Sequence, residues 1–197
     1  MANIPIQAGE EEIVFQGKIV EVVQTPMKIG DKVINFEMAR RSPGTRLLIV
    51  DLKKKQILLT KEYRSELQNY DYRLPGGKVF DKLTQYNEFL KSGDKGMLSQ
   101  AENRAKIEAR EEAGIDTKSI THVHTSKNGA TMEWDLYYFV IDGWEQTEQS
   151  LELGEDIEIS WQDFDSAKEL ALDGKMKEDR SVAVLLKWLY NYEKNNS

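Results

Sequence analysis

Residues 106–115 read KIEAREEAGI and carry three glutamates on one side of a predicted helix. Glu108, Glu111 and Glu112 stand at positions i, i+3 and i+4, a spacing that places side chains on one helical face. Like charges at this spacing destabilise a helix by about 0.2–0.5 kcal/mol per pair. Something in the folded protein must therefore compensate the negative charge of this face.

Basic partners within the same helix are few. Glu111 and Glu112 have no lysine or arginine three or four positions away, and only Glu108 has one, Arg104. A solvated acidic face with i,i+4 ion pairs is the plain alternative, and it would need more basic neighbours than this. Carboxylate oxygens suit hard divalent cations such as Mg²⁺ or Mn²⁺. The pattern indicates that either a cation or a distant basic residue holds the cluster.

The composition narrows the class of protein. The chain has 197 residues, 40% of them hydrophobic, which suffices for one domain or one domain with a small appendage. The net charge of −7 argues against a general nucleic-acid binder, and the absence of cysteine excludes disulfides and cysteine-based sites. The first residues do not resemble a signal peptide, and no apolar run approaches the roughly 18 residues of a membrane span. We therefore expect a cytoplasmic protein with neither nucleic-acid nor membrane partners.

The first third of the chain is rich in strand signals. Residues 13–25 are largely β-branched, and we expect Pro26 to interrupt them. Gly30 and Asp31 are typical of a hairpin turn before an alternating stretch that ends at Arg40. Further strands are predicted over residues 47–52, 56–63, 132–144 and 157–161.

Four helices are predicted after the first strands. The first covers residues 81–96 and should stop at Ser92-Gly93. The second covers 98–114, with a capping box formed by Ser99 and Glu102 and with Gly114 at its C-terminal end. Two more helices are predicted at 165–174 and 180–194.

The stretch RLPGGKVF at 73–80 is predicted to be a loop, because it holds a proline and the adjacent glycines Gly76 and Gly77. Glycines before an acidic helix resemble the signature of the Nudix hydrolase family. That signature runs glycine, five residues, glutamate, seven residues, then Arg-Glu-apolar-x-Glu-Glu-x-Gly-apolar. Its second half matches residues 108–115, and its opening glycine matches Gly77.

The match departs from the signature at three points. The signature arginine falls on Ile107, and the first glutamate falls on Ser99. Ser99 lies 22 positions after Gly77, where the signature expects six, so we interpret 81–96 as a helical insertion. Arg104, one turn before Glu108, is our candidate to replace the missing arginine in orienting a glutamate.

Within the family, the chain looks like the ADP-ribose and nucleoside-diphosphate-sugar pyrophosphatase branch. The resemblance rests on the strand-rich residues 13–40, EYR at 62–64, LPGG at 74–77 and GEDIEI at 154–159. It implies an α/β fold, a Nudix-type α/β/α sandwich with a mixed sheet and an N-terminal antiparallel strand layer. It also implies a strand region at 1–45 for dimerisation and substrate binding, then a hydrolase domain at 46–194 with the insert. On this resemblance we expect a homodimer.

The resemblance implies Mg²⁺- or Mn²⁺-dependent hydrolysis of the pyrophosphate bond of ADP-ribose or a related nucleoside diphosphate sugar. The metal ligands and catalytic residues would be Glu108, Glu111 and Glu112. The Gly76 carbonyl would be an extra metal ligand, and Gly77 would be a substrate-binding residue. A loop glutamate usually serves as the general base, and we prefer Glu155 over the alternatives Glu152 and Glu158. Arg64 is the candidate phosphate contact, with a surface ion pair to Glu62 or Glu66 as its alternative.

Other interpretations stay open. Ile107 and Ser99 favour a non-catalytic module that binds a nucleotide ligand or a protein partner, whereas the retained glutamates favour an enzyme. A hydrolase of another substrate, such as a dinucleoside polyphosphate or a coenzyme, is a third possibility. Arg73 stands where many relatives are expected to have glutamate, beside the substrate pocket. His122 and His124 alternate on a predicted strand and are expected to share a face, although no third metal ligand is evident.

Overall fold

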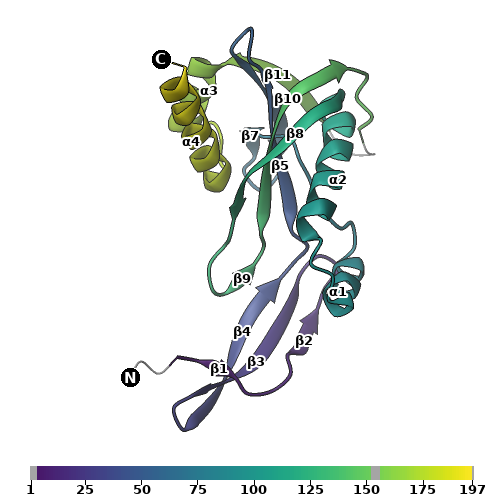
Figure 1. Ribbon diagram of the computed structural model, residues 1–197, viewed down its shortest axis with the longest axis vertical. Coiled ribbons are helices and arrows are strands. Elements are labelled where there is room, and N and C mark those ends of the chain that lie inside the picture. The colour runs from purple at the N-terminus through teal and green to yellow at the C-terminus, as the bar shows by residue number, and fades with distance from the viewer. Residues whose placement is uncertain (1–3, 152–155, 197) are drawn as a thin grey trace. The chain divides into compact units, whose positions relative to one another are not determined.

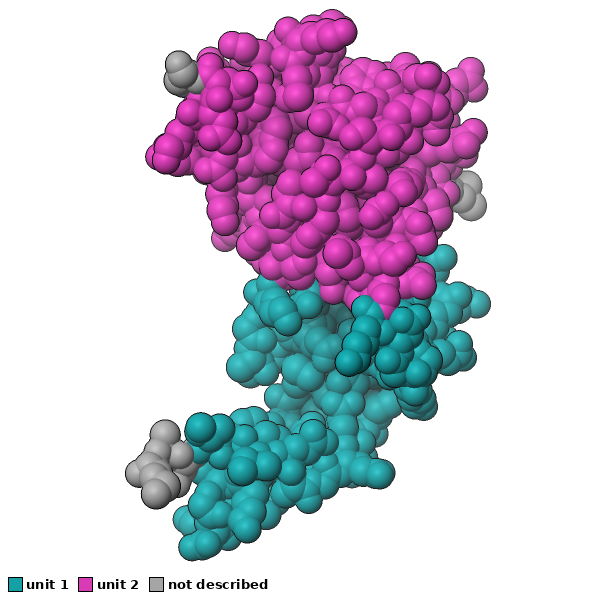
Figure 2. Space-filling model, in the orientation of Figure 1, with its two compact units in different colours: residues 1–43, 80–95, 127–135 teal, residues 44–79, 96–126, 136–197 magenta. Residues whose placement is uncertain are grey.

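The computed structural model describes residues 4–151 and 156–196, which belong to two compact units (Figures 1 and 2). Unit 1 comprises residues 1–43, 80–95 and 127–135, and unit 2 comprises residues 44–79, 96–126 and 136–197. The predicted insertion and the segment before the long strand 136–146 therefore group with the N-terminal strands. Among the described residues, none of the helices is both long and apolar enough to cross a lipid bilayer.

Unit 1 is built on a sheet in which β3 is central. β3 and β4 form an antiparallel hairpin whose turn holds Gly30 at φ +60°, as the sequence predicts. β1 and β2 both pair with β3, and the short β9 adds to β4 in parallel. The strands are β1 (Ile6–Gln7), β2 (Glu12–Gln16), β3 (Glu21–Ile29), β4 (Lys32–Arg40) and β9 (Met132–Glu133).

Pro26 does not interrupt the strand, so that prediction is wrong. It lies inside β3, opposite Asn35 of β4. A proline removes one hydrogen-bond donor from the ladder but keeps its carbonyl, and the Pro26 carbonyl accepts the N–H of Ala8 at 2.8 Å. The strand continues because the lost donor is the only local cost.

The insertion forms helix α1 (Leu83–Ser92), which belongs to unit 1. Its end is where the sequence predicts it, since Gly93 adopts φ +70° and donates its N–H to the Leu90 carbonyl. Leu83 and Tyr86 are buried, and the ring of Tyr86 stacks on Phe80 at 5.7 Å between centroids. The helix is thus a packed part of unit 1.

Unit 1 contains a partly buried ionic cluster centred on Arg40, which is itself buried, as is Glu21. The guanidinium donates to both oxygens of Glu11 (2.6 and 2.7 Å) and to Glu133 (3.0 Å), and it lies 3.5 Å from a Glu21 oxygen. Burial by itself would lower the pKa of Arg40, but the hydrogen bonds and charges of Glu11 and Glu133 raise it above its ordinary value. The arginine is therefore held firmly in its charged form.

Helix α1 is joined to this cluster by two side chains. Tyr86 donates its hydroxyl to Glu133 at 2.6 Å, and Asn87 donates to Glu21 at 2.8 Å. Burial, together with the hydrogen bond to Glu133, raises the pKa of the Tyr86 hydroxyl. The cluster therefore joins β3, β4, β9 and α1 into one unit.

Unit 2 is a mixed six-stranded sheet with helices on both faces (Figure 1). β5 and β10 pair in parallel at the centre, and the other pairs are antiparallel. Helix α2 covers one face, and α3 and α4 cover the other. The elements are β5 (Gly44–Asp51), β6 (Gln56–Arg64), β7 (Asn69–Arg73), α2 (Met97–Glu111), β8 (Ile115–Ser126), β10 (Leu136–Gln146), β11 (Ile157–Asp163), α3 (Phe164–Leu172) and α4 (Asp179–Asn195).

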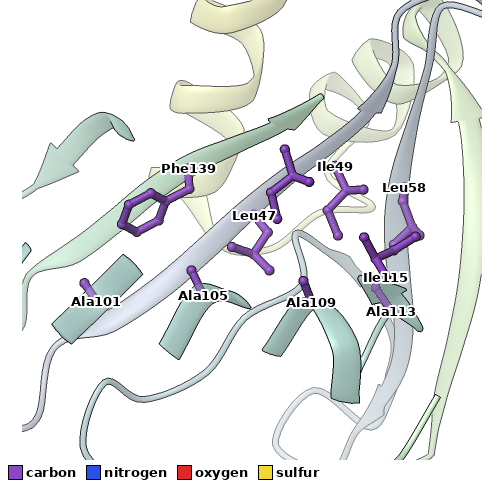
Figure 3. Close-up of a cluster of buried hydrophobic side chains, with 10 residues drawn as sticks. Leu47, Ile49, Leu58, Ala101, Ala105, Ala109, Ala113, Ile115 and Phe139 are labelled. Carbon is purple, nitrogen blue, oxygen red and sulfur yellow. The ribbon is translucent and has the colours of Figure 1, made fainter. Parts of the chain in front are cut away.

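The main core of unit 2 lies between α2 and the sheet (Figure 3). α2 presents a stripe of alanines spaced four residues apart, which puts them on one face and allows the helix to approach the strands closely. Their partners are large aliphatic and aromatic side chains. The cluster contains Ala101, Ala105, Ala109 and Ala113 with Leu47, Ile49, Leu58, Ile115, Phe139 and Ile141, all fully buried.

The predicted capping box at the start of α2 is wrong. The helix begins at Met97 with Gly96 as its N-cap, so Ser99 lies within the first turn and no side chain caps the helix. Glu102 instead accepts a hydrogen bond from Lys106 at 2.7 Å. The other end agrees with the prediction, because Gly114 has φ +60° and donates to the Arg110 carbonyl.

Candidate functional site

The acidic helix face meets the glycine loop within unit 2. Glu108 is only 5% exposed, and its carboxylate lies against the backbone of Gly77. A Cβ atom at position 77 would stand 2.0 Å from Glu108 Oε1, closer than any real contact. Gly77 is therefore a glycine because the carboxylate occupies the space that a side chain would need.

Gly76 is required for a different reason. Its φ of +139° is open only to glycine, and a Cβ atom there would lie 2.3 Å from the Thr45 carbonyl oxygen of β5. The N–H of Gly76 donates to Glu112 Oε2 at 2.7 Å. The two glycines thus bring the loop onto β5 on one side and onto two glutamates of α2 on the other.

Arg104 supplies the positive charge that the sequence pattern requires. Its Nε donates to Glu108 Oε1 at 2.7 Å, and its Nη2 lies 3.6 Å from Glu111 Oε2. Ile107, at the signature's arginine position, is instead 45% exposed. The expected contact between Arg104 and Glu108 is therefore present, and it comes from one turn earlier on the helix.

A second arginine, Arg46, approaches the glycine loop from β5. It is 7% exposed, and its Nη1 donates to the carbonyls of Thr45 (2.8 Å) and Gly76 (3.1 Å). Burial is the main cause that lowers the pKa of Arg46, and the positive charge of Arg73 lowers it further. The negative charges of Glu178 and Glu112 raise this pKa, but by less. The sequence analysis missed this residue, although a charge directly before the apolar run 47–50 was a visible signal.

Glu178 stands at the N-terminus of α4 and was also missed. Its carboxylate accepts from the N–H of Ser181 and from Arg180 Nε, each at 3.0 Å. Burial would raise the pKa of Glu178, but the hydrogen bonds of Ser181 and the charges of Arg46 and Arg180 lower it overall. The segment between the two predicted C-terminal helices therefore also provides a partly buried anion that acts on Arg46.

Several predicted residues have other surroundings. Arg64 pairs with Glu62 (3.2 Å) and Glu66 (2.7 Å), which is the surface ion pair considered as its alternative. Glu158 is exposed and lies 3.4 Å from Lys61. The preferred general base Glu155, and the alternative Glu152, lie outside the described residues.

The two histidines do not share a face, so that prediction is wrong. The ring of His122 lies 5.5 Å from Phe139, whereas that of His124 lies 6.1 Å from Tyr138. Neighbouring residues of β10 point to opposite faces of the sheet, and the pairing of β8 with β10 shifts between these positions. The bulge separates the histidines, which removes the basis for a metal-binding pair.

The glutamates suit a divalent cation in the kind of atoms they offer. Carboxylate and carbonyl oxygens are the preferred ligands of Mg²⁺ and Mn²⁺, and the missing side chain at Gly77 leaves room for the Glu108 carboxylate. In the described parts of the chain, no three acidic or histidine side chains already form a metal-binding group. Arg104 neutralises two of the three glutamates in this arrangement.

Comparisons with known proteins agree with this fold. No protein-family model matches the sequence, and no curated protein matches it. A solved structure described as the crystal structure of an ADP compounds hydrolase is similar, with a TM-score of 0.70 and 16% identity over 98% of this chain and 97% of that chain. Likeness at this identity concerns the fold. It confirms the predicted α/β class, with a mixed sheet between helices and an N-terminal sheet of mainly antiparallel strands.

Proposed function

We propose that this protein hydrolyses the pyrophosphate bond of ADP-ribose or a related nucleoside diphosphate sugar, giving a nucleoside monophosphate and a sugar phosphate. The observation that carries the proposal is the contact of Glu108 and Glu112 with the Gly76-Gly77 loop. The structural neighbour, named as a hydrolase of ADP compounds, supports a nucleotide-derived substrate. A binding module has no evident need for three glutamates on one helical face, two of which contact a glycine loop.

A divalent cation, Mg²⁺ or Mn²⁺, would be held by Glu108, Glu111 and Glu112. When bound, such an ion neutralises phosphate charge and lowers the pKa of a bound water. A carbonyl oxygen has two lone pairs, so the contact of Gly76 with Arg46 is compatible with Gly76 as an additional ligand. Hard oxygen donors of this kind match these ions rather than zinc or copper.

The protein's own side chains would orient this acidic cluster. Arg104 fixes the carboxylate of Glu108, and the N–H of Gly76 fixes that of Glu112. Glu155 remains our proposed general base, to take a proton from the attacking water. Arg64 remains our proposed phosphate contact, which would exchange its carboxylate partners for a phosphate.

The experiment measures phosphate release, with added phosphatase, from ADP-ribose and a panel of nucleoside diphosphate sugars, with and without Mg²⁺ or Mn²⁺. Glu112→Gln removes the charge but keeps an oxygen for the Gly76 N–H. We expect metal-dependent turnover that falls about 100-fold or more in this variant. Glu102→Gln is the matched control, since Glu102 is an exposed glutamate of the same helix paired with Lys106, and it should turn over like the parent.

The competing proposal is a catalytically weak or inactive module that binds a nucleotide ligand or a protein partner. The observation that favours it is the pair of departures at Ile107 and Ser99, and Ile107 is exposed. No turnover on any substrate, from folded protein that binds Mn²⁺, would favour this second function. Turnover lost equally in the Glu112 and Glu102 variants would also argue against the first.

We also propose a homodimer formed through the N-terminal strands. Unit 1 exposes several large apolar side chains on its strands. Exposed apolar surface of this kind often marks a protein–protein interface. Light scattering at micromolar concentration should give twice the chain mass of 22.7 kDa. A monomeric mass would contradict this proposal. The exposed side chains include Ile6, Ile13, Phe15, Val33, Ile34 and Phe36.

A further inference from the structure

We propose that Arg46 is a positioning residue of the candidate site. Its guanidinium holds the carbonyl of Gly76, and the Gly76 N–H in turn holds the carboxylate of Glu112. The effect on turnover rests on the proposed function, whereas the effect on Gly76 itself does not.

Two hydrogen bonds connect Arg46 to Glu112 through the single residue Gly76. Arg46 Nη1 lies 3.1 Å from the Gly76 carbonyl oxygen, and the Gly76 nitrogen lies 2.7 Å from Glu112 Oε2. Gly76 has backbone angles open to many orientations, because no side chain restricts it. A donor on its carbonyl side therefore limits the orientation of the N–H on its other side.

A second anchor keeps the guanidinium itself in place. The same Nη1 donates to the carbonyl of Thr45 at 2.8 Å, and Thr45 also donates its N–H to the Gly77 carbonyl at 2.8 Å. Arg46 thus bridges two neighbouring segments, β5 and the glycine loop. A lysine ends in a freely rotating ammonium group on a flexible stem, without the planar guanidinium that fixes the direction of the Nη1–H bonds, and holds such a bridge less rigidly.

The burial of Arg46 is hard to explain by stability alone. A buried guanidinium loses hydration, and the hydrogen bonds of Arg46 to described residues go to backbone carbonyls and not to a carboxylate. Its main partners are two backbone carbonyls, while Glu178 and Glu112 act on it through space. An apolar residue would suit the strand better. The retained charge indicates a role at the loop that it contacts.

The primary test measures amide hydrogen exchange at Gly76 by NMR in the full chain. In Arg46→Met the Gly76 N–H should exchange at least tenfold faster than in the parent, while the amide of Ile141, in the core of β10, stays protected. Arg64→Met is the matched control, as it removes a partly exposed, ion-paired arginine from the neighbouring strand and leaves the contacts of Arg46 in place. Unchanged exchange at Gly76 in folded Arg46→Met overturns the proposal.

Arg46→Lys decides the question if the methionine variant does not fold. It keeps the buried charge, and Gly76 exchange should rise severalfold because the flexible ammonium group replaces the rigid, planar guanidinium. Exchange equal to the parent's would overturn the proposal.

Kinetics separate positioning from a direct substrate contact. If Arg46 acts through Glu112, its loss should lower kcat about tenfold with KM within threefold of the parent. A raised KM with unchanged kcat would assign Arg46 to the substrate and overturn the positioning role. If the parent turns over no substrate, the proposed function fails and the exchange measurement still decides the role of Arg46.

Discussion

Unit 1 and unit 2 each bury one arginine, and the two are held in opposite ways. Arg40 in unit 1 contacts three carboxylates, from Glu11, Glu21 and Glu133. Arg46 in unit 2 contacts two backbone carbonyls. Accordingly, the pKa of Arg40 is raised by its partners, whereas burial and a neighbouring arginine lower the pKa of Arg46.

On this difference we propose a structural role for Arg40 and a functional role for Arg46. The charge of Arg40 is paired directly with carboxylates, and its cluster joins four elements of unit 1. The charge of Arg46 is incompletely matched and lies beside the glycine loop and its glutamates. Incompletely matched buried charges gather at functional sites, and the difference therefore supports our proposal that the chemistry lies in unit 2.

The strongest test of the comparison removes Arg40. Arg40→Met leaves Glu11, Glu21 and Glu133 close together without their cation, so we expect a loss of about 3–5 kcal/mol in the free energy of unfolding. Urea unfolding at neutral pH measures this loss, with Arg64→Met as the control, because this arginine is partly exposed and its removal is expected to change stability by about 1 kcal/mol or less. A loss below about 1 kcal/mol for Arg40→Met would mean that the cluster does not hold unit 1 together.

The elements of both units could be predicted from the sequence wherever a local sequence pattern specifies them. The stop at Gly93 and the hairpin turn at Gly30 each need a positive φ, which one residue type supplies. The acidic face of α2 follows from helical spacing alone. These features depend on residues within a few positions of one another, so they can be predicted from the sequence without knowing the fold.

The features that sequence reasoning missed depend on distant partners. The Arg40 cluster contains residues 11, 21 and 133, which are far apart in the sequence, and no sequence pattern links them. Arg46 can contact Gly76 only because the glycine loop runs beside β5 in the fold. The histidine prediction failed at a β-bulge, which shifts the alternation of a strand and leaves no clear mark in composition.

A smaller effect tests how α1 is joined to the Arg40 cluster. Tyr86→Phe removes the hydroxyl that donates to Glu133 at 2.6 Å. A hydrogen bond to a charged group contributes about 1.5–3 kcal/mol, and Glu133 keeps its contact with Arg40, so we expect a loss near 1.5 kcal/mol at neutral pH.

The pH dependence of this loss has a definite sign. Burial, with the Glu133 hydrogen bond, raises the pKa of Tyr86 above that of the unfolded chain, which is about 10. The stabilisation from Tyr86 is therefore complete below pH 10 and declines as the pH rises further, by up to about 1.4 kcal/mol per unit. Phenylalanine does not titrate, so the stability difference between parent and variant should narrow above pH 10. Urea unfolding at pH 7, 9, 10.5 and 11 measures it, and a constant difference would show that the Tyr86 hydroxyl is not held by the cluster.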